Sequence, residues 1–228
     1  MKISKNTLKV LQSFAQINQS IYIEAGDKHL STMSIDKNIL GRVAIEEEFD
    51  VEFGIYNLGE FLAAVALFDD PDFDFTEKFV TISSGKDKIK YSSVEKELVV
   101  SPPKTINFPD SDIIITVSDK DLTDAIKAAS VLSSPSLIIH DVGDNIELSC
   151  YDPNNSSSNT WNRVLCKNDS GHQDFEFIIS IDNMKLLPQD YKLDIAAKGI
   201  TKWTGVDAGA ETIYYLALDL MSRGGTPI

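Results

Sequence analysis

The stretch SDKDLTDAIKAASVLSSPSLIIHDVGDNIELSCY (118–151) contains the two kinds of element that decide the fold class. Ser118 is a favourable N-cap, and it precedes an apolar stripe with three- and four-residue spacing, which predicts a helix to about Leu132. That stripe consists of Leu122, Ala125, Ile126 and Ala129. Two apolar segments follow, Ser136–His140 and Ile146–Tyr151, around a Gly-Asp-Asn turn, which is typical of a β-hairpin. A helix followed by an antiparallel hairpin predicts an α+β protein.

The same order of elements occurs near the start of the chain. Ser4–Ile17 carries Leu8, Leu11, Phe14 and Ala15 at helical spacing, with Ser4 as its N-cap. Ser20–Ala25 and His29–Ile35 flank a Gly-Asp turn and predict a second hairpin. Further predictions for this half are strands at Gly41–Ile45, Phe49–Ile55, Phe79–Ser83, Lys88–Ser92 and Glu97–Val100, a helix over Leu58–Phe68 capped by Asn57, and an acidic loop at Asp69–Asp74.

The second half continues with predicted strands at Trp161–Cys166, Phe175–Ile179, Tyr191–Ala196 and Ile213–Leu218. A short fourth helix, from Asp182 through Leu187, ends at Pro188. Each half therefore reads helix, hairpin, strand, strand, helix, hairpin, which predicts two similar domains. Three prolines between residues 101 and 109 exclude regular structure there, so we expect a linker between domains 1–108 and 109–228.

Composition excludes several classes of protein. Hydrophobic residues make up 43% of the 228 residues, enough for packed cores. No window is apolar enough for a membrane span, and polar residues interrupt any signal-peptide pattern, so we expect neither a membrane protein nor a secreted one. The net charge of −14 argues against tight DNA binding, since duplex affinity depends mainly on phosphate neutralisation.

Known catalytic and metal-binding motifs are missing or broken. The two cysteines, Cys150 and Cys166, and the scattered histidines do not form a zinc pattern. The acidic loop resembles the start of a calcium loop, but Phe75 and Thr81 stand where glycine and glutamate are needed. The glycine spacing of a phosphate-binding loop is present, but Glu60 stands where such a loop needs a lysine to reach the phosphates. The sequence thus predicts no cofactor, no metal and no enzymatic activity.

Lysines lie on helix faces opposite the apolar stripes. Lys5 and Lys9 share one face of the first helix, Lys120 and Lys127 lie two turns apart on the third, and Lys185 lies on the fourth. A charged outer face is ordinary for a helix in water. On the third helix, the acidic residues Asp119, Asp121 and Asp124 also interrupt the basic face.

The whole chain, from Met1 to about Leu218, resembles the DNA polymerase sliding clamps of T-even-type bacteriophages. Many short collinear stretches carry the resemblance, and the most specific is Phe175–Pro188. The others include Met-Lys-Ile-Ser-Lys at 1–5, 49–51, 55–58, the proline-rich stretch 99–109, 191–193 and 197–199.

The resemblance implies a DNA clamp fold with two similar domains, sheets outside and two helices per domain inside. It further implies that three copies close a ring around duplex DNA in the cytoplasm of an infected bacterium. Such a ring holds DNA by topology, without sequence preference, so an acidic chain needs only a sparse lysine lining. Expected partners are the replicative DNA polymerase, a clamp loader and two further copies of the chain. The implied DNA-facing residues are Lys5, Lys9, Lys120, Lys127 and Lys185.

The resemblance also implies a hydrophobic pocket for partner tail peptides near the linker, for which the candidate residues are Ile106, Phe108, Ile213 and Tyr215. Two alternatives remain open from the residues alone. One is an acidic DNA mimic or inhibitor that binds a basic partner. The other is an enzyme with an acidic site at Asp69–Asp74.

Overall fold

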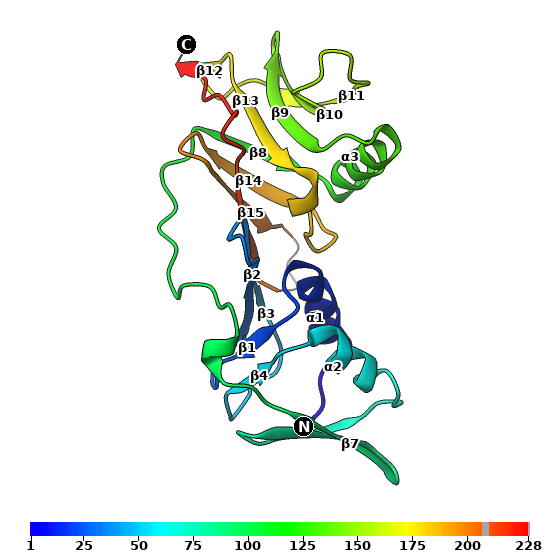
Figure 1. Cartoon of the computed structure of the whole chain (residues 1–228). Helices are drawn as coiled ribbons and strands as arrows, with labels where there is room; N and C mark the ends of the chain where they lie inside the picture. Colours follow the sequence, from blue (N-terminus) through cyan, green and yellow to red (C-terminus); the bar gives the residue numbers. More distant parts are fainter. Residues whose placement is uncertain (207–209, 228) are drawn as a thin grey trace. The chain divides into compact units, whose positions relative to one another are not determined.

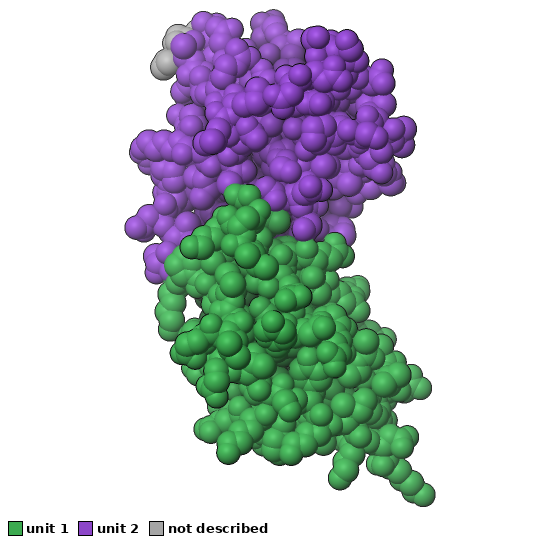
Figure 2. Space-filling model, viewed as in Figure 1, with its two compact units in different colours: residues 1–104, 210–212 green, residues 105–209, 213–228 purple. Residues whose placement is uncertain are grey.

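The computed structural model describes residues 1–206 and 210–227, which fall into two compact units (Figure 2). The first unit comprises Met1–Lys104 with Ala210–Thr212, and the second comprises Thr105–Gly209 with Ile213–Ile228. Both are built from antiparallel sheets and few helices (Figure 1), so the predicted α+β class is confirmed.

The first unit contains two α-helices, α1 (Lys5–Ile17) and α2 (Leu58–Val65), and a single 3-10 turn, η1 (Lys96–Leu98). Its strands are β1 (Ile21–Ile23), β2 (His29–Met33), β3 (Ile39–Ala44), β4 (Phe53–Ile55), β5 (Asp72–Phe75), β6 (Phe79–Ser84) and β7 (Asp87–Ser92). β5, β6 and β7 form one three-stranded sheet in that order.

Helix α1 begins where the sequence predicted. The Ser4 hydroxyl accepts a hydrogen bond from the Thr7 amide and so satisfies one of the free donors of the first turn. The buried stripe is rotated relative to our prediction, because Leu8 and Ala15 are only half-buried. The buried positions are Thr7, Val10, Leu11, Phe14 and Ile17.

The predicted hairpin between residues 20 and 35 is wrong, although both of its strands exist. β1 pairs antiparallel with β4, and β2 pairs with β3. Gly26, at φ 71°, donates its amide to the Phe49 carbonyl, so the chain turns toward the segment that leads into β4 instead of back along β1.

Three further predictions for this unit need correction. The predicted strand at 97–100 does not form, since residues 97 and 98 belong to the turn η1 and residues 99 and 100 are irregular. Only Phe53–Ile55 of the alternating stretch 49–55 pairs as a strand. The acidic loop is partly strand, since Asp72–Phe75 is β5 and buries Phe73 against the core. Phe73 pairs directly with Ile82 on β6, and this burial outweighs the polarity of its acidic neighbours.

The core of the first unit is aromatic. Phe14 of α1 and Phe61 of α2 are almost completely buried, and the two helices pack together. The Phe75 ring makes edge-to-face contacts with Phe49 and Phe53, each at 5.2 Å between centroids. This cluster anchors the β5–β6–β7 sheet.

The second unit contains one α-helix, α3 (Asp119–Leu132), and a 3-10 turn, η2 (Ile181–Asn183), within residues 105–206 and 213–227. Its main strands are β8 (Ile113–Val117), β9 (Ser136–Val142), β10 (Asn145–Tyr151), β11 (Trp161–Lys167), β13 (Glu176–Ser180), β14 (Tyr191–Ala196), β15 (Ile200–Gly205) and β16 (Thr212–Ala217). Two short strands, β12 (His172–Gln173) and β17 (Thr226–Pro227), pair with each other. One sheet has the order β11-β10-β9-β13, and another contains the run β16-β15-β14-β8.

Helix α3 and the hairpin β9–β10 lie where the sequence predicted. The Ser118 side chain accepts from the Asp121 amide, and the Asp121 side chain accepts in return from the Ser118 amide, which completes a capping box. The helix packs on β9, β10 and β11. Ile126 is the exception to the predicted stripe, because it remains 37% exposed.

The predicted fourth helix is reduced to the single 3-10 turn η2, and Lys185 lies beyond it in non-helical chain. Only seven residues separate the end of β13 from Pro188, which disfavours helical geometry at Leu187. Such a segment is too short to offset the cost of helix nucleation. The sequence also missed β8 and β15, two strands that flank β14.

The core beneath β14, β15 and β16 is built on Tyr191, Trp203 and Tyr214, all completely buried. The Trp203 indole donates to the Thr201 hydroxyl at 2.9 Å, and the Tyr191 hydroxyl donates to the Leu187 carbonyl at 2.7 Å. These bonds satisfy polar groups that would otherwise be costly to bury.

Candidate nucleic-acid interface and partner pocket

The outer face of α1 carries Lys5, Lys9, Gln12 and Gln16, and all four side chains are exposed. Their spacing of four, three and four residues places them on one side of the helix, opposite Leu11 and Phe14. No acidic residue lies in this helix, so its outer face presents two positive charges and two amides to solvent.

The outer face of α3 is mixed in charge. Lys120 and Lys127 are exposed, but the Lys120 ammonium lies 2.6 Å from the Asp124 carboxylate one turn along the helix. The side chain of Lys120 is nonetheless 78% exposed. A surface pair of this kind contributes little to stability, so Lys120 stays available to another anion.

Tertiary structure adds a cation to α3 that sequence reasoning missed. Arg163, from β11, donates from Nη1 to Asp121 at 3.0 Å and from Nη2 to Asp124 at 2.8 Å. The hydrogen bonds from Lys120 and then Arg163 lower the pKa of Asp124 to about 2. The pKa of Asp121 is also lowered, because hydrogen bonds from Ser118 and Arg163 outweigh its burial. No local motif could have found this contact, since the partners are about forty residues apart.

Cys150 has a structural environment under this helix. Its Sγ donates to the Ala125 carbonyl at 3.3 Å, and burial raises the pKa of the thiol to about 11. A thiol held protonated in this way is a poor nucleophile.

The structure brings together two of the four residues expected in a partner pocket. The rings of Phe108 and Tyr215 lie 6.1 Å apart between centroids and are tilted by 45°. Ile213, two residues before Tyr215 on β16, lies on the same face of the strand, and its side chain is half-buried. Ile106 is half-buried in the chain just before Phe108.

The Phe108–Tyr215 contact lies on the outer face of the sheet. Along one row of directly paired residues, Tyr215 is followed by Lys202, Asp194 and Ile114. Ile114 is 55% exposed, so apolar side chains stand at both ends of this row. The face therefore offers apolar side chains with two charged residues, Lys202 and Asp194, between them, and the Asp194 carboxylate forms an ion pair with Lys192 at 3.3 Å.

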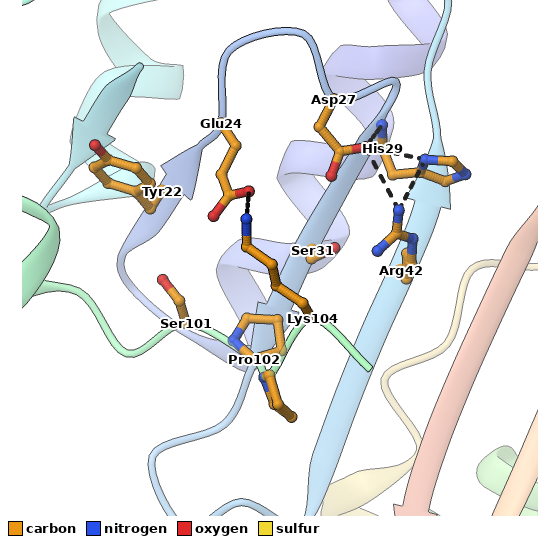
Figure 3. Close-up of a pocket in the computed structure, with 10 residues that line it drawn as sticks. Tyr22, Glu24, Asp27, His29, Ser31, Arg42, Ser101, Pro102 and Lys104 are labelled. Atoms are coloured by element: carbon orange, nitrogen blue, oxygen red, sulfur yellow. Dashed lines mark hydrogen bonds and ion pairs between the residues drawn. The ribbon is translucent and has the colours of Figure 1, made fainter. Parts of the chain in front are cut away.

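A small polar hollow lies in the first unit, where residues 101–104 pass β1 and β2 (Figure 3). Its charged lining consists of Glu24 and Asp27, balanced by Arg42 and Lys104. The imidazole of His29 lies between Asp27 and Arg42, 3.1 Å from the Asp27 carboxylate. No pattern in the sequence indicated this cluster.

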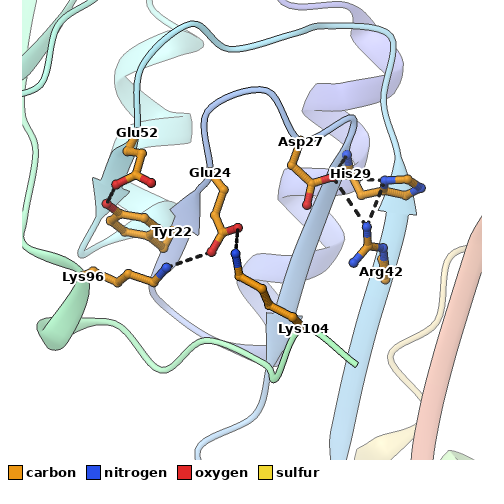
Figure 4. A network of polar contacts seen from close by, with 8 residues as sticks. All are labelled: Tyr22, Glu24, Asp27, His29, Arg42, Glu52, Lys96 and Lys104. Carbon is orange, nitrogen blue, oxygen red and sulfur yellow. Dashed lines mark hydrogen bonds and ion pairs between the residues drawn. The ribbon is translucent and has the colours of Figure 1, made fainter. Parts of the chain in front are cut away.

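Glu24 joins two separate segments in a polar network (Figure 4). Its carboxylate lies 2.7 Å from the Lys96 ammonium and 3.4 Å from that of Lys104, and the bond from Lys96 lowers the pKa of Glu24. Tyr22 is part of the same network: its hydroxyl donates to the Glu52 carboxylate at 2.7 Å, and burial together with this hydrogen bond raises the pKa of Tyr22 to about 12. The network holds the start of the proline-rich segment on β1.

The acidic segment at 69–74 is an ion-paired surface in the structure. The Lys2 ammonium lies 3.0 Å from Asp70 and 3.5 Å from Asp72. Within residues 1–206 and 210–227, no group of three or more His, Cys, Asp or Glu is placed to hold a metal ion. In the same part of the chain, no helix is long and apolar enough to cross a membrane.

Two family models together match most of the chain. A model of the DNA polymerase processivity factor matches residues 3–101, and a model of the C-terminal part of the gp45 sliding clamp matches residues 114–219. The sliding clamp of Vibrio phage KVP40 is 32% identical over 212 residues, covering 90% of this chain and 95% of that protein. The sliding clamp of Enterobacteria phage T4 is 28% identical over 204 residues, covering 87% and 89%.

A solved structure with the same fold is that of PCNA from A. fulgidus, bound to the C-terminal region of FEN-1. It superposes with a TM-score of 0.72 at 11% identity, and the match covers 97% of this chain and 98% of that one. At this identity the likeness shows the fold alone, whereas the phage relatives and the family models show the family. This chain belongs to the gp45 sliding clamp family of DNA polymerase processivity factors.

Proposed function

We propose that three copies of this chain form a closed ring that encircles duplex DNA and tethers the replicative DNA polymerase, after loading by an ATP-dependent clamp loader. The observation that carries the proposal is an acidic chain of a sliding clamp family with lysines on the solvent faces of its helices. In this proposal residues 1–108 and 109–228 are two clamp domains, and residues 101–109 link them. The ring works in the cytoplasm of the infected bacterial host.

The DNA-facing residues in this proposal are Lys5, Lys9, Lys120 and Lys127, all exposed on α1 and α3. Lys185 is a weaker candidate, because its side chain is half-buried and follows the turn η2 instead of lying on a helix. A net charge of −14 repels DNA at long range, and a sparse basic lining offsets that repulsion near the duplex. Because the ring holds DNA by topology, strong phosphate contacts are unnecessary and would slow sliding.

The proposed docking place for partner tails, including that of the polymerase, is the surface around Phe108 and Tyr215. Aromatic anchors with nearby polar groups are the usual centres of protein–peptide interfaces. Ile106 and Ile213 complete the apolar part of this surface.

Primer extension with the cognate polymerase and clamp loader tests the proposed function. Adding the chain is expected to lengthen products from a single binding event by at least roughly tenfold, because a tethered polymerase rebinds at high effective concentration. Light scattering of the same sample is expected to give three times the 25.2 kDa chain mass. A stable monomer at micromolar concentration, or unchanged product length, would contradict the ring.

Replacing Phe108 by alanine tests this proposed docking surface. We expect roughly tenfold weaker binding of a labelled polymerase tail peptide, measured by fluorescence anisotropy, because truncation of an interface aromatic commonly costs 1–2 kcal/mol. Ile114→Ala is the matched control, since Ile114 is exposed at the far end of the same sheet face. If the Phe108→Ala variant bound the peptide as tightly as the unmodified chain, the docking surface would not include Phe108.

A further inference from the structure

The charges on α3 do not balance within the helix itself. Its residues include Lys120 and Lys127 against Asp119, Asp121 and Asp124, so the isolated helix would be net negative. A helix with that balance is a poor lining for DNA, because fixed carboxylates repel phosphates at short range. For this face to line a ring around DNA, a cation from another element has to offset the net negative charge of the helix.

Arg163 on β11 provides that charge. It pairs directly with Leu148 of β10 across the sheet, and this register directs its side chain to the face that α3 covers. The guanidinium bonds Asp121 and Asp124 with separate nitrogens, and the two carboxylates lie three residues apart on neighbouring turns. The planar fork of arginine suits this two-site contact, whereas a lysine ammonium would not span it equally well.

The arrangement holds Arg163 in place. Its guanidinium carbon lies 5.1 Å from the centre of the Trp161 ring, and its side chain is only 29% exposed. Both partner carboxylates are similarly shielded, at 25% and 27% exposure. The arginine is therefore positioned to act through the two aspartates and is poorly placed to grip a phosphate by itself.

We propose that Arg163 is a positioning residue for DNA passage: together with Lys120 it neutralises Asp121 and Asp124, which brings the charge of the α3 region from −1 to zero and leaves Lys127 as the basic charge on the exposed face of the helix. The proposal rests on the proposed function, in which that face lines the ring. Without Arg163, Asp124 would be balanced only by Lys120, and Asp121 would keep its hydrogen bonds from Ser118 but lose its cationic partner.

Arg163→Gln tests this inference in the primer-extension assay. Products are expected to be about threefold shorter than those of the unmodified chain at about 0.1 M salt, and the difference should shrink at about 0.5 M as screening increases. Arg223→Gln is the matched control: it also removes one positive charge from the second unit, and it breaks one arginine–carboxylate pair, that with Glu176, where Arg163→Gln breaks two. Equal defects in the two variants would show a general effect of net charge and would overturn the proposal.

The decisive variant is the triple replacement Arg163→Gln with Asp121→Asn and Asp124→Asn. It lacks both ion pairs, so a purely structural role of Arg163 predicts that the defect persists. Our proposal predicts that product length recovers, because both carboxylates that Arg163 bonds are gone. Persistence of the defect would overturn the inference, whereas failure of the unmodified chain to lengthen products would instead overturn the proposed function.

Discussion

Replacing Gly54 by alanine is expected to unfold the first unit at a urea concentration about 1.5 M lower than in the unmodified chain. A Cβ at this position would lie 2.2 Å from the Val94 carbonyl oxygen, an impossible distance for non-bonded atoms. The Val94 amide donates to the Gly54 carbonyl at 3.0 Å, and the Gly54 amide donates to the Ser93 hydroxyl at 3.1 Å. Residues 93–94 therefore cannot move away from an added Cβ at position 54 without breaking both hydrogen bonds.

The size of that shift follows from the cost of overpacking. Forced displacement in a packed core costs about 3 kcal/mol. For a unit of this size the urea dependence is about 2 kcal/mol per molar, which gives the 1.5 M shift. Gly54 lies on β4, so the β1–β4 pair and the segment leading into α2 are the parts most directly disturbed.

Two spectroscopic signals can separate the two units in this experiment. Both tryptophans, Trp161 and Trp203, lie in the second unit, so indole fluorescence reports on that unit while far-ultraviolet circular dichroism reports on both. We expect the midpoint of the dichroism transition to shift to lower urea concentration, and the midpoint of the fluorescence transition to shift less. Gly59→Ala is the control: its added Cβ meets nothing closer than 3.5 Å, and alanine is favoured in helix α2. An unchanged dichroism transition for Gly54→Ala would contradict the prediction.

The double replacement Lys5→Glu with Lys127→Glu is expected to shorten primer-extension products roughly tenfold at about 0.1 M salt. Each replacement changes the local charge by two units, and the two positions are exposed on α1 and α3. In the proposed ring this turns a sparse basic lining into an acidic one, which opposes passage of the duplex. The effect should weaken as salt rises, because the Debye length shortens.

The matched control is Lys37→Glu with Lys198→Glu. These lysines are exposed in the turns between β2 and β3 and between β14 and β15, one in each unit, so the total charge change is the same. Primer extension with the control variant should give products as long as those of the unmodified chain. Light scattering should give the mass of the trimer for both double variants. If the Lys5 and Lys127 variant also retained product length, these lysines would not line the ring.

Local sequence signals predicted the three α-helices well, but not the fourth helix, which is a 3-10 turn. Ser4, Asn57 and Ser118 each accept a hydrogen bond from a backbone amide of the first turn, as their positions predicted. A cap interaction spans three residues, so the sequence contains all of it. The same holds for the β9–β10 hairpin, whose two-residue turn fixes its register.

Strand pairing was predicted less well, because its partners are distant. β1 was expected to pair with the next strand but pairs with β4, about thirty residues along. β8 and β15 were missed although they flank β14, since their short apolar runs lie beside a proline-rich segment and a glycine turn. These pairings are decided by the burial of whole sheet faces, and a short segment of sequence does not contain the partner strands that bury them.

The sequence by itself determined the fold class, the starts of α1, α2 and α3, the exposed lysines of α1 and α3 and the family, because each rests on local patterns or on collinear resemblance. Only the tertiary structure decided that Arg163 bonds both Asp121 and Asp124, that the Phe108 and Tyr215 rings are in contact, and that the Val94 carbonyl leaves no room for a side chain at Gly54. The physical reason is that these contacts join residues about forty to more than a hundred positions apart. Their geometry follows from how sheets and helices pack, and packing is a property of the whole folded unit.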